Sequence, residues 1–589
     1  MKKGKGLLIK RHLFYIGALF SLFLIVNVAP QQVKATIYWD DEADNQLEVN
    51  DTLHKTGGIH ASSSKGEKQS FIVVYKEKSE RTTAKIEAIT HTEASDEYDT
   101  VLNGIATEAT VEEIMAVEAL PEVSYVTYDH QIQALDTRGN SLAGISAYRS
   151  LVGGDKGAGL VIAVIDTGVD LSHYAFSVAP PSPRLNATSY KLAGVDHGKY
   201  INSKIPYSYS YVTSSGEQEA AHYHGTHVAG IAASRSYAID YYGVSYNIEG
   251  AAPDAQIVNM QVFEPTTNST TSESVVIKAI DDAVKLKVDV INLSLGSPKA
   301  RSIAFNQVIK DAKDKGIMVV AAAGNYESAN KIDQSPVSFD LDLKDQWTIS
   351  TPSTAPEAIS VAASTLGNQL SGYSSWGGDT TILDFKPEVT AYGGSGYSLP
   401  DFVIGPVPSG SALSFMSGTS MATPLVSAGA ALVKKALSTK YSGVTLADQV
   451  DIALVNTAKP LFESGSKPYS PRKQGAGLMQ VQNAVKNKVV ITDVTTNDDT
   501  LSDGILELKK ITSRLITRQL KLINTSNTDV SYEWNDLGVY QNDVVKANVT
   551  LTDKLINYSN IFIKNGSVNI AKDSGIITVP KNSTVTLTV

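Results

Sequence analysis

Three short segments of the chain contain residue types that could perform acyl transfer through a serine. Asp166 follows an apolar run at 160–165, His224 lies in a His-Gly-Thr-His segment, and Ser420 lies in a Gly-Thr-Ser-Met-Ala segment. A serine nucleophile needs a base that takes its proton and a carboxylate that orients the base. The three residues together predict a catalytic triad in the chain order Asp, His, Ser.

A fourth residue, Asn325, could stabilise the reaction intermediate. It follows an apolar run at 317–321 and small residues at 322–324. A side-chain amide at a strand end can donate a hydrogen bond to an oxyanion, and Ser420 at the start of a helix can add its backbone N–H. Taken singly, an Asp loop cap, a Ser N-cap and an Asn turn residue are ordinary features, so the prediction depends on their combination.

A metal site is the main chemical alternative for the His224 segment. His222, His224 and His227 have the H-x-H-x-x-H spacing of some zinc hydrolases. Those sites also need an Asp before the third His, where this chain has Thr226, and further downstream ligands that are usually His. All ten histidines lie at or before His227. We therefore predict no metal site, a packed His227 and a loop position for His222.

The elements that must hold these residues alternate between strands and helices from about 140 to 487. Parallel strands that are covered on both faces are indicated by continuous apolar runs at 160–165 and 317–321 and by a mostly apolar run at 288–293 that includes Asp289 and Asn292. Helical spacing at 303–315 gives a βαβ unit, and 421–437 predicts a long buried helix. The pattern predicts a doubly wound α/β domain, which places ligands at the carboxyl ends of its strands.

These motifs resemble those of the subtilisin-like serine peptidases over roughly 140–487. The matching segments are Asp166-Thr167-Gly168, His224 to Gly230, Ala323-Gly324-Asn325, and Gly418 to Pro424. The resemblance implies a mostly parallel subtilisin-like sheet and an Asp166, His224, Ser420 triad with Asn325 at the oxyanion. It also implies that Ser294, Leu295 and Gly296 form an edge that binds the substrate backbone.

The same resemblance bears on cofactors and specificity. The chemistry requires no cofactor. Members of the family often bind structural Ca²⁺, but no clustered Asp loop in this sequence locates a site. Leu295 and the small residues near Asn325 predict a pocket for a large apolar side chain.

Within the family, the chain is similar to the Gram-positive cell-envelope proteinases of the lactocepin type. The similarity lies in the segment 200–206 and in a β-rich module after the catalytic domain. Two differences stand out. The interval between Asn325 and Ser420 is too short for the protease-associated domain that many of them insert there, and 266–271 replaces their usual glycine-rich substrate strand. No wall-sorting motif supports surface anchoring.

The first 35 residues have the pattern of a secretory signal peptide. Basic residues precede an apolar run at 13–29, and Val33 and Ala35 supply the small residues of a cleavage site. We expect an exported protein, secreted and in contact with the cell envelope, without a membrane span once the signal is removed. An uncleaved anchor is the alternative, because the run approaches spanning length.

Residues 36–138 are predicted to be a propeptide with an inhibitor-like α+β unit at about 70–130. Strands are expected at 71–75 and 125–128, and Thr110 with Glu113 forms a capping box for the helix between them. The unit resembles a subtilase propeptide, which implies that it inhibits the enzyme through a tail at 131–140. A separate small adhesive domain is the alternative.

The remaining parts of the chain are a peptidase domain at 139–487 and a β-rich module at 488–589. Short strands separated by Asn, Thr and Gly turns predict a β-sandwich, fibronectin-III-like in type. The sequence ends inside an alternating strand at 584–589, so we expect the module to be incomplete.

Composition limits the remaining classes. A net charge of −10 without long single-sign blocks argues against nucleic acid as a partner. The absence of cysteine removes thiol nucleophiles, thiolate metal sites and disulfides. The sequence predicts a secreted endopeptidase zymogen that acts on proteins or peptides. An inert adhesin on the same fold, and an esterase or transferase with the same triad, are the alternatives.

Overall fold

The computed structural model describes residues 68–77, 82–94, 96–98, 103–128, 138–218, 223–241, 244–264, 270–298, 302–326, 348–377, 386–396, 401–464, 467–493, 517–533, 539–542, 553–556, 563–570 and 575–589. The predicted signal peptide, residues 131–137 of the predicted tail at 131–140, and His222 lie outside these ranges, as does most of the 266–271 segment. The chain divides into two compact units, residues 1–133 and 134–589.

The first unit is a four-stranded antiparallel sheet with two helices. The strand order is β2-β3-β1-β4, and side chains of the sheet and both helices share one apolar core. Its elements are β1 (Gln69–Tyr75), α1 (Thr83–Thr90), β2 (Asp96–Tyr98), β3 (Gly104–Ala109), α2 (Val111–Glu118) and β4 (Val123–Tyr128).

The predicted capping box of this unit is confirmed. Thr110 Oγ1 accepts from the Glu113 N–H at 3.3 Å, and Glu113 Oε2 accepts from the Thr110 N–H at 2.9 Å. The helix ends at Glu118. Proline disfavours helical geometry at the residue before it, so the approach to Pro121 becomes a turn. Leu120 still packs against the core from that turn.

The second unit is built on a seven-stranded parallel sheet with the order β15-β14-β12-β10-β5-β9-β6. Its strands are β5 (Val161–Asp166), β6 (Tyr207–Ser210), β9 (Gln256–Gln261), β10 (Val290–Leu293), β12 (Met318–Ala322), β14 (Ile359–Ser364) and β15 (Val389–Tyr392). After β5 the chain places β6 at one edge of the sheet and then β9 between β6 and β5, and it adds β10, β12, β14 and β15 in turn on the other side of β5. A switch point of this kind opens a crevice at the carboxyl ends of the strands.

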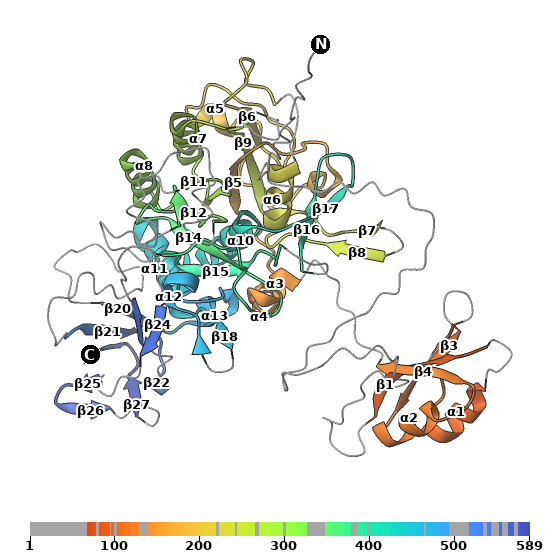
Figure 1. Cartoon of the computed structure of the whole chain (residues 1–589). Coiled ribbons are helices and arrows are strands. Elements are labelled where there is room, and N and C mark those ends of the chain that lie inside the picture. The colour runs from red at the N-terminus through yellow and green to blue at the C-terminus, as the bar shows by residue number, and fades with distance from the viewer. Residues whose placement is uncertain are drawn as a thin grey trace, which may run out of the picture. The chain divides into compact units, whose positions relative to one another are not determined.

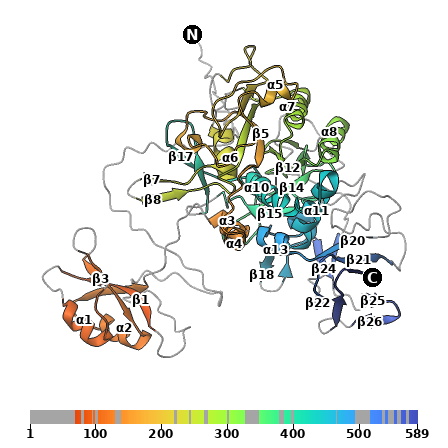
Figure 2. The same ribbon diagram turned by 180° about the vertical axis from the view of Figure 1, so that it is seen from behind.

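Helices cover both faces of this sheet (Figures 1 and 2). On β5, Ile162 and Val164 face α6 (Tyr223–Ala233) and α10 (Thr419–Leu437), whereas Val161, Ala163 and Ile165 face α7 (Glu273–Lys285) and α8 (Ile303–Asp314). Because both faces are buried, the central strand β5 is apolar up to its last residue, Asp166. The predicted doubly wound α/β fold is confirmed for this domain.

Shorter elements surround the sheet. The helices are α3 (Arg138–Leu142), α4 (Ile145–Leu151), α5 (Ser189–Leu192), α11 (Gly443–Asn456), α12 (Pro471–Gln474) and α13 (Val481–Lys486). The two-stranded pairs are β7 (Tyr237–Tyr241) with β8 (Val244–Ile248), β11 (Ser297–Pro298) with β13 (Ser350–Thr351), β16 (Val403–Pro406) with β17 (Leu413–Met416), and β18 (Phe462–Ser464) with β19 (Lys467–Pro468).

The C-terminal residues form antiparallel strands around a small apolar core. One sheet has the order β20-β21-β28-β25-β26, and β22 pairs with β27 and β23 with β24. The strands are β20 (Val489–Asp493), β21 (Gln519–Asn524), β22 (Val530–Glu533), β23 (Val539–Asn542), β24 (Asp553–Ile556), β25 (Ile563–Asn565), β26 (Val568–Ile570), β27 (Ile576–Val579) and β28 (Ser583–Thr588).

No helix in the described ranges has the length and apolar character needed to span a bilayer. Within the same ranges, no three or more His, Asp or Glu side chains are grouped so that they could hold a metal ion.

Candidate active site

Asp166 is the last residue of β5, at the carboxyl edge of the sheet, and only 1% of its surface is exposed. Its Oδ1 accepts a hydrogen bond from the Thr167 N–H at 2.7 Å and lies 2.8 Å from His224 Nδ1. A carboxylate at this distance from Nδ1 fixes the imidazole tautomer that carries its proton on Nδ1. The structure therefore brings two of the predicted site residues into direct contact.

The loop after Asp166 holds the helix that carries His224. The Gly225 N–H donates to Thr167 Oγ1 at 2.9 Å. A Cβ on Gly225 would lie 2.4 Å from the Gly168 carbonyl oxygen, so only glycine allows this close approach. At the next residue of the helix, Thr226 Oγ1 accepts from the Asp170 N–H at 2.9 Å. The two loop-to-helix bonds fix the distance between the carboxylate and the imidazole.

The environment of His224 favours its protonated form. Burial disfavours the imidazolium, but the Asp166 charge and hydrogen bond outweigh burial and hold the pKa of His224 above its ordinary value of 6.5. A base whose conjugate acid is stabilised in this way suits a reaction in which the imidazole takes a proton near neutral pH.

The raised pKa predicts the acid limb of the pH profile. A general base must be neutral, so kcat/KM should rise with pH through the pKa of His224 and be lost below it. We expect the midpoint of this limb above 6.5, because Asp166 raises the pKa. Steady-state hydrolysis of a peptide amide across pH 5–9 measures the midpoint. A midpoint below 6.5 would contradict the assignment of His224 as the base.

His227 lies in the interior on the same helix, as predicted. It is fully buried, and its Nε2 lies 3.3 Å from the Ser414 carbonyl oxygen. Burial, together with the nearby His224, lowers the pKa of His227 to about 3. A histidine that stays neutral and bound to a carbonyl packs the helix against its neighbours.

Ser420 lies in the first turn of α10, behind the N-cap Gly418. Its Oγ donates to the Ser294 carbonyl at 3.2 Å, and Ser294 Oγ donates back to the Ser420 carbonyl at 2.8 Å. Backbone N–H groups in a first turn have no partner within the helix, so that of Ser420 is available to an anion. Pro424 lies inside α10 and lacks the N–H that would bond the Ser420 carbonyl, and that carbonyl accepts from Ser294 Oγ instead.

Asn325 is held by the residue next to Ser420. Its Oδ1 accepts from the Thr419 N–H at 2.9 Å and from Thr419 Oγ1 at 3.0 Å. These bonds leave the Nδ2 group to donate elsewhere. A Cβ on Gly418 would lie 3.4 Å from Asn325 Nδ2 and 3.6 Å from the Ser420 N. The two predicted oxyanion donors therefore lie close to one another, beside a residue without a side chain.

The predicted substrate edge follows β10. Ser294 is buried, Leu295 is half-buried and Gly296 is exposed. The three residues lie between β10 and β11 rather than inside a strand, and β11 then pairs with β13. A Cβ on Gly296 would lie 2.8 Å from that of Ser350 in β13, so glycine is required where these segments meet.

Sequence reasoning missed the buried polar residues that connect β10 to α10. Asn292 Nδ2 donates to Ser294 Oγ at 3.0 Å, and Ser427 Oγ donates to Asn292 Oδ1 at 2.8 Å. Both Asn292 and Ser427 are fully buried. A signal was present, because each is a polar residue inside an otherwise apolar strand or helix, and buried polar groups are normally paired.

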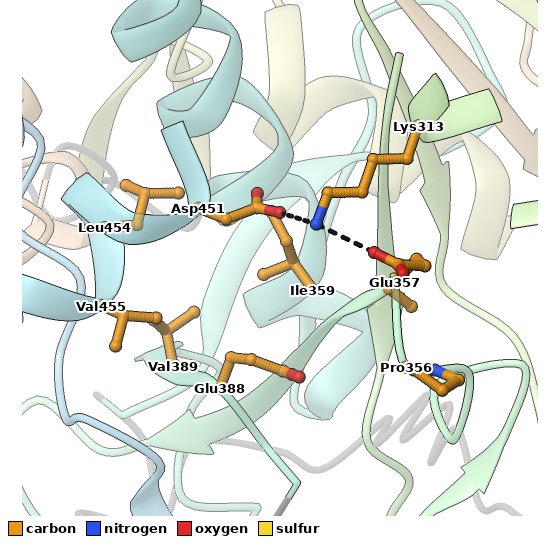
Figure 3. Close-up of a pocket in the computed structure, with 10 residues that line it drawn as sticks. Lys313, Pro356, Glu357, Ile359, Glu388, Val389, Asp451, Leu454 and Val455 are labelled. Carbon is orange, nitrogen blue, oxygen red and sulfur yellow. Dashed lines mark ion pairs between the residues drawn. The ribbon is translucent and has the colours of Figure 1, made fainter. Parts of the chain in front are cut away.

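A small pocket elsewhere in this unit contains a cluster of charges (Figure 3). Lys313 on α8 is 2.8 Å from Asp451, 3.0 Å from Glu357 and 3.4 Å from Asp448. Burial opposes the charge of Lys313, but the carboxylates hold its pKa above the ordinary range. The hollow has a volume of about 10 Å³, which is room for one water rather than a substrate. We therefore assign this cluster of charges a structural role.

Comparison with known proteins identifies the class. Residues 157–477, more than half of the chain, match the model of the subtilase family. The chain therefore belongs to the subtilase family, and the serine-type endopeptidase class predicted from its motifs is supported. The matched range includes Asp166, His224, Asn325 and Ser420.

Individual relatives give a narrower comparison. The PII-type proteinase of Lacticaseibacillus paracasei is 30% identical over 291 residues, covering 48% of this chain and 15% of the relative. The C5a peptidase of Streptococcus pyogenes serotype M3 is 32% identical over 229 residues, covering 36% and 19%. The predicted similarity to cell-envelope proteinases is confirmed, and the matched part is a small fraction of their length.

Among solved structures, the prenylagaramide maturation protease PagA aligns with a TM-score of 0.41 at 20% identity. The alignment covers 58% of this chain and 97% of that chain.

Proposed function

We propose that this chain is a secreted serine endopeptidase, made as a zymogen, that hydrolyses peptide bonds in proteins. The observation that carries the proposal is the 2.8 Å contact between His224 Nδ1 and Asp166 Oδ1 at the carboxyl edge of the sheet. Ser420 and Asn325 support it, because each is oriented by hydrogen bonds at the start of α10. The proteinase names of the relatives favour a protein substrate.

The proposed reaction follows from these positions. Ser420 Oγ attacks the scissile carbonyl while His224 Nε2 takes its proton, and Asp166 stabilises the imidazolium that forms. The carbonyl oxygen becomes an oxyanion that accepts hydrogen bonds from Asn325 Nδ2 and the Ser420 N–H. His224 then gives its proton to the leaving amine. Water next attacks the carbonyl of the acyl-enzyme while His224 takes a proton from it, and His224 returns that proton to Ser420 Oγ as the acid product leaves.

The flanking regions complete the proposal. We assign residues 1–35 to a signal peptide and 36–138 to a propeptide that inhibits the enzyme, with the peptidase domain at 139–487. The α+β unit around β1 and α2 has its own core, which supports an independent inhibitory unit. Residues 488–589 form a β-sandwich module in this proposal, and the relatives suggest an extracellular place at the cell envelope.

The oxyanion assignment makes a separate prediction. Asn325→Ala should lower kcat and leave KM nearly unchanged, because the donor is used mainly when the oxyanion forms. Removing such a donor from a subtilisin lowers kcat by about 10²–10³-fold, which sets the scale. Steady-state kinetics on a peptide amide measure both constants. A rise in KM with an unchanged kcat would place Asn325 in substrate binding instead.

The proposed activity is tested by incubating the purified chain with an unfolded protein and mapping the new termini by mass spectrometry. We expect cleavage at internal peptide bonds, and none with the His224→Ala variant. Hydrolysis of small esters without any peptide cleavage would favour the esterase alternative. A folded chain that cleaves neither substrate would favour an inert adhesin.

A further inference from the structure

A buried histidine outside the proposed triad joins two loops near the site. His173 is fully buried and precedes the short 3₁₀ turn Tyr174–Phe176. Its Nδ1 accepts from the Ala175 N–H at 3.0 Å, and its Nε2 lies 3.2 Å from the Ala412 carbonyl oxygen. Because Nδ1 accepts, the neutral ring carries its proton on Nε2 and donates it to Ala412.

The loop that contains Ala412 connects β16 to β17. It forms two more hydrogen bonds with the segment that contains His173. Asp170 Oδ2 accepts from the Ser409 N–H at 3.2 Å, and the Tyr174 N–H donates to the Gly410 carbonyl at 3.0 Å. With the His173 bond, three hydrogen bonds fasten the tip of this hairpin to the segment that follows β5.

The body of the hairpin lies tightly against α6. A Cβ on Gly230 would lie 2.1 Å from Pro406 Cδ, and one on Gly405 would lie 2.9 Å from the His227 ring. His227 itself is 3.3 Å from the Ser414 carbonyl oxygen of β17. With no free space at this contact, a shift of the hairpin must also shift the helix that carries the proposed base.

The hairpin also leads to the proposed nucleophile. β17 ends at Met416, and the Gly418 N–H, between β17 and Ser420, donates to the Gly393 carbonyl at 2.9 Å. The hairpin is therefore in contact with the segment after Asp166, with the helix of His224 and with the approach to Ser420. It therefore adds a structural connection among the segments that carry the three proposed catalytic residues.

The two hydrogen bonds of His173 require a neutral ring, and its surroundings favour that form. Burial lowers the pKa of His173, and the nearby Asp170 charge only partly opposes the effect. Its aromatic neighbours Phe176 and Tyr237 carry no charge at neutral pH, and their ring centroids lie 6.1 Å away. The ring is neutral at pH 7 and keeps both of its hydrogen bonds.

Building on the proposed function, we propose that His173 is a positioning residue for peptide cleavage. Its Nε2–H fastens the β16–β17 hairpin to the segment after Asp166, and the hairpin in turn holds the His224 helix and the approach to Ser420 in register. A displacement of about 1 Å at reacting groups can cost about 10²-fold in rate, so a loosened hairpin should slow acylation of Ser420.

Two substitutions test the two hydrogen bonds of the His173 ring one at a time. In His173→Asn, the amide oxygen can replace Nδ1 as acceptor for Ala175, but the side chain is too short to reach Ala412. In His173→Gln, the amide nitrogen can replace Nε2 as donor to Ala412. The measurement is the rate of labelling by a fluorophosphonate at pH 7.5, with thermal unfolding of each full chain as the control for folding.

We expect His173→Asn to label about 10- to 100-fold more slowly than the native chain, and His173→Gln to recover most of that loss. The proposal would be overturned if the two variants were labelled at the same rate, whether that rate is native or reduced. It would also be overturned if His173→Gln were labelled more slowly than His173→Asn. If His173→Asn does not fold, Asp170→Ala removes the Ser409 bond of the same tip and should slow labelling; a native rate there also overturns the proposal. An unlabelled native chain would instead refute the proposed function.

Discussion

Replacing Ser420 with alanine is expected to abolish peptide hydrolysis and to leave the expressed chain at precursor length. The substitution removes the attacking oxygen, and only the oxyanion donors and substrate binding remain. Hydrolysis should fall by about four orders of magnitude or more. The precursor should persist because the proposed enzyme removes its own propeptide. Gel mobility and intact mass of the purified protein, together with peptide hydrolysis, measure both effects.

Ser438→Ala is the matched control for this experiment. Ser438 is an exposed residue that caps the other end of α10, and its Oγ donates to the Lys435 carbonyl. This variant should be processed and active like the native chain. If the Ser420→Ala chain were shortened normally, another protease would process it. If it hydrolysed peptides at the native rate, Ser420 would not be the nucleophile.

Asp166→Asn should lower kcat by about 10⁴-fold while the protein remains folded. The asparagine keeps the shape of the carboxylate, but its amide can turn an N–H toward His224 and favour the wrong tautomer. It also removes the negative charge that raises the pKa of His224. The residual activity should therefore show an acid limb at lower pH than in the native chain. Peptide hydrolysis measured across pH 5–9 tests both effects.

Asp196→Asn provides the comparison for a carboxylate that is also paired with a histidine. The Asp196 side chain is 97% exposed and lies 2.8 Å from His197. Its replacement should leave kcat and the acid limb unchanged. If Asp166→Asn retained native kcat, or if its acid limb moved to higher pH, Asp166 would not be the residue that orients His224.

The elements that carry the site could be predicted because their sequence patterns are local. The apolar run at 160–165 corresponds to β5, and those at 288–293 and 317–321 correspond to β10 and β12. Strands that are buried on both faces are mostly apolar, so the pattern is strong. The helix predicted at 303–315 spans Ile303–Asp314 for a related reason, since one face is apolar.

The edge strand β6 was not predicted because its burial depends on distant residues. Its sequence Tyr-Ser-Tyr-Ser has the alternation of a half-exposed strand, yet Ser208 and Ser210 are buried. Ser208 Oγ accepts from Asn259 Nδ2 on β9 at 2.9 Å. A single sequence gives no indication of which polar residue on another strand supplies such a partner.

In the candidate site, too, the local features could be predicted and the contacts between distant segments could not. Asp166 and His224 could be paired from their motifs, because the end of a strand and the start of a helix each limit where a side chain can lie. The attachment of Asn325 to Thr419, and of Ser420 to Ser294, joins segments far apart in the sequence. His173 was overlooked for this reason, since its partner Ala412 contributes only a backbone carbonyl.

The most direct test of the proposed mechanism is to label the purified chain with a fluorophosphonate and to locate the adduct by mass spectrometry. We predict one adduct, on Ser420, in a species shortened by loss of the propeptide. The Ser420→Ala and His224→Ala variants should carry none. An adduct on another residue, or a folded and processed native chain without any adduct, would contradict the assignment of Ser420 as an activated nucleophile.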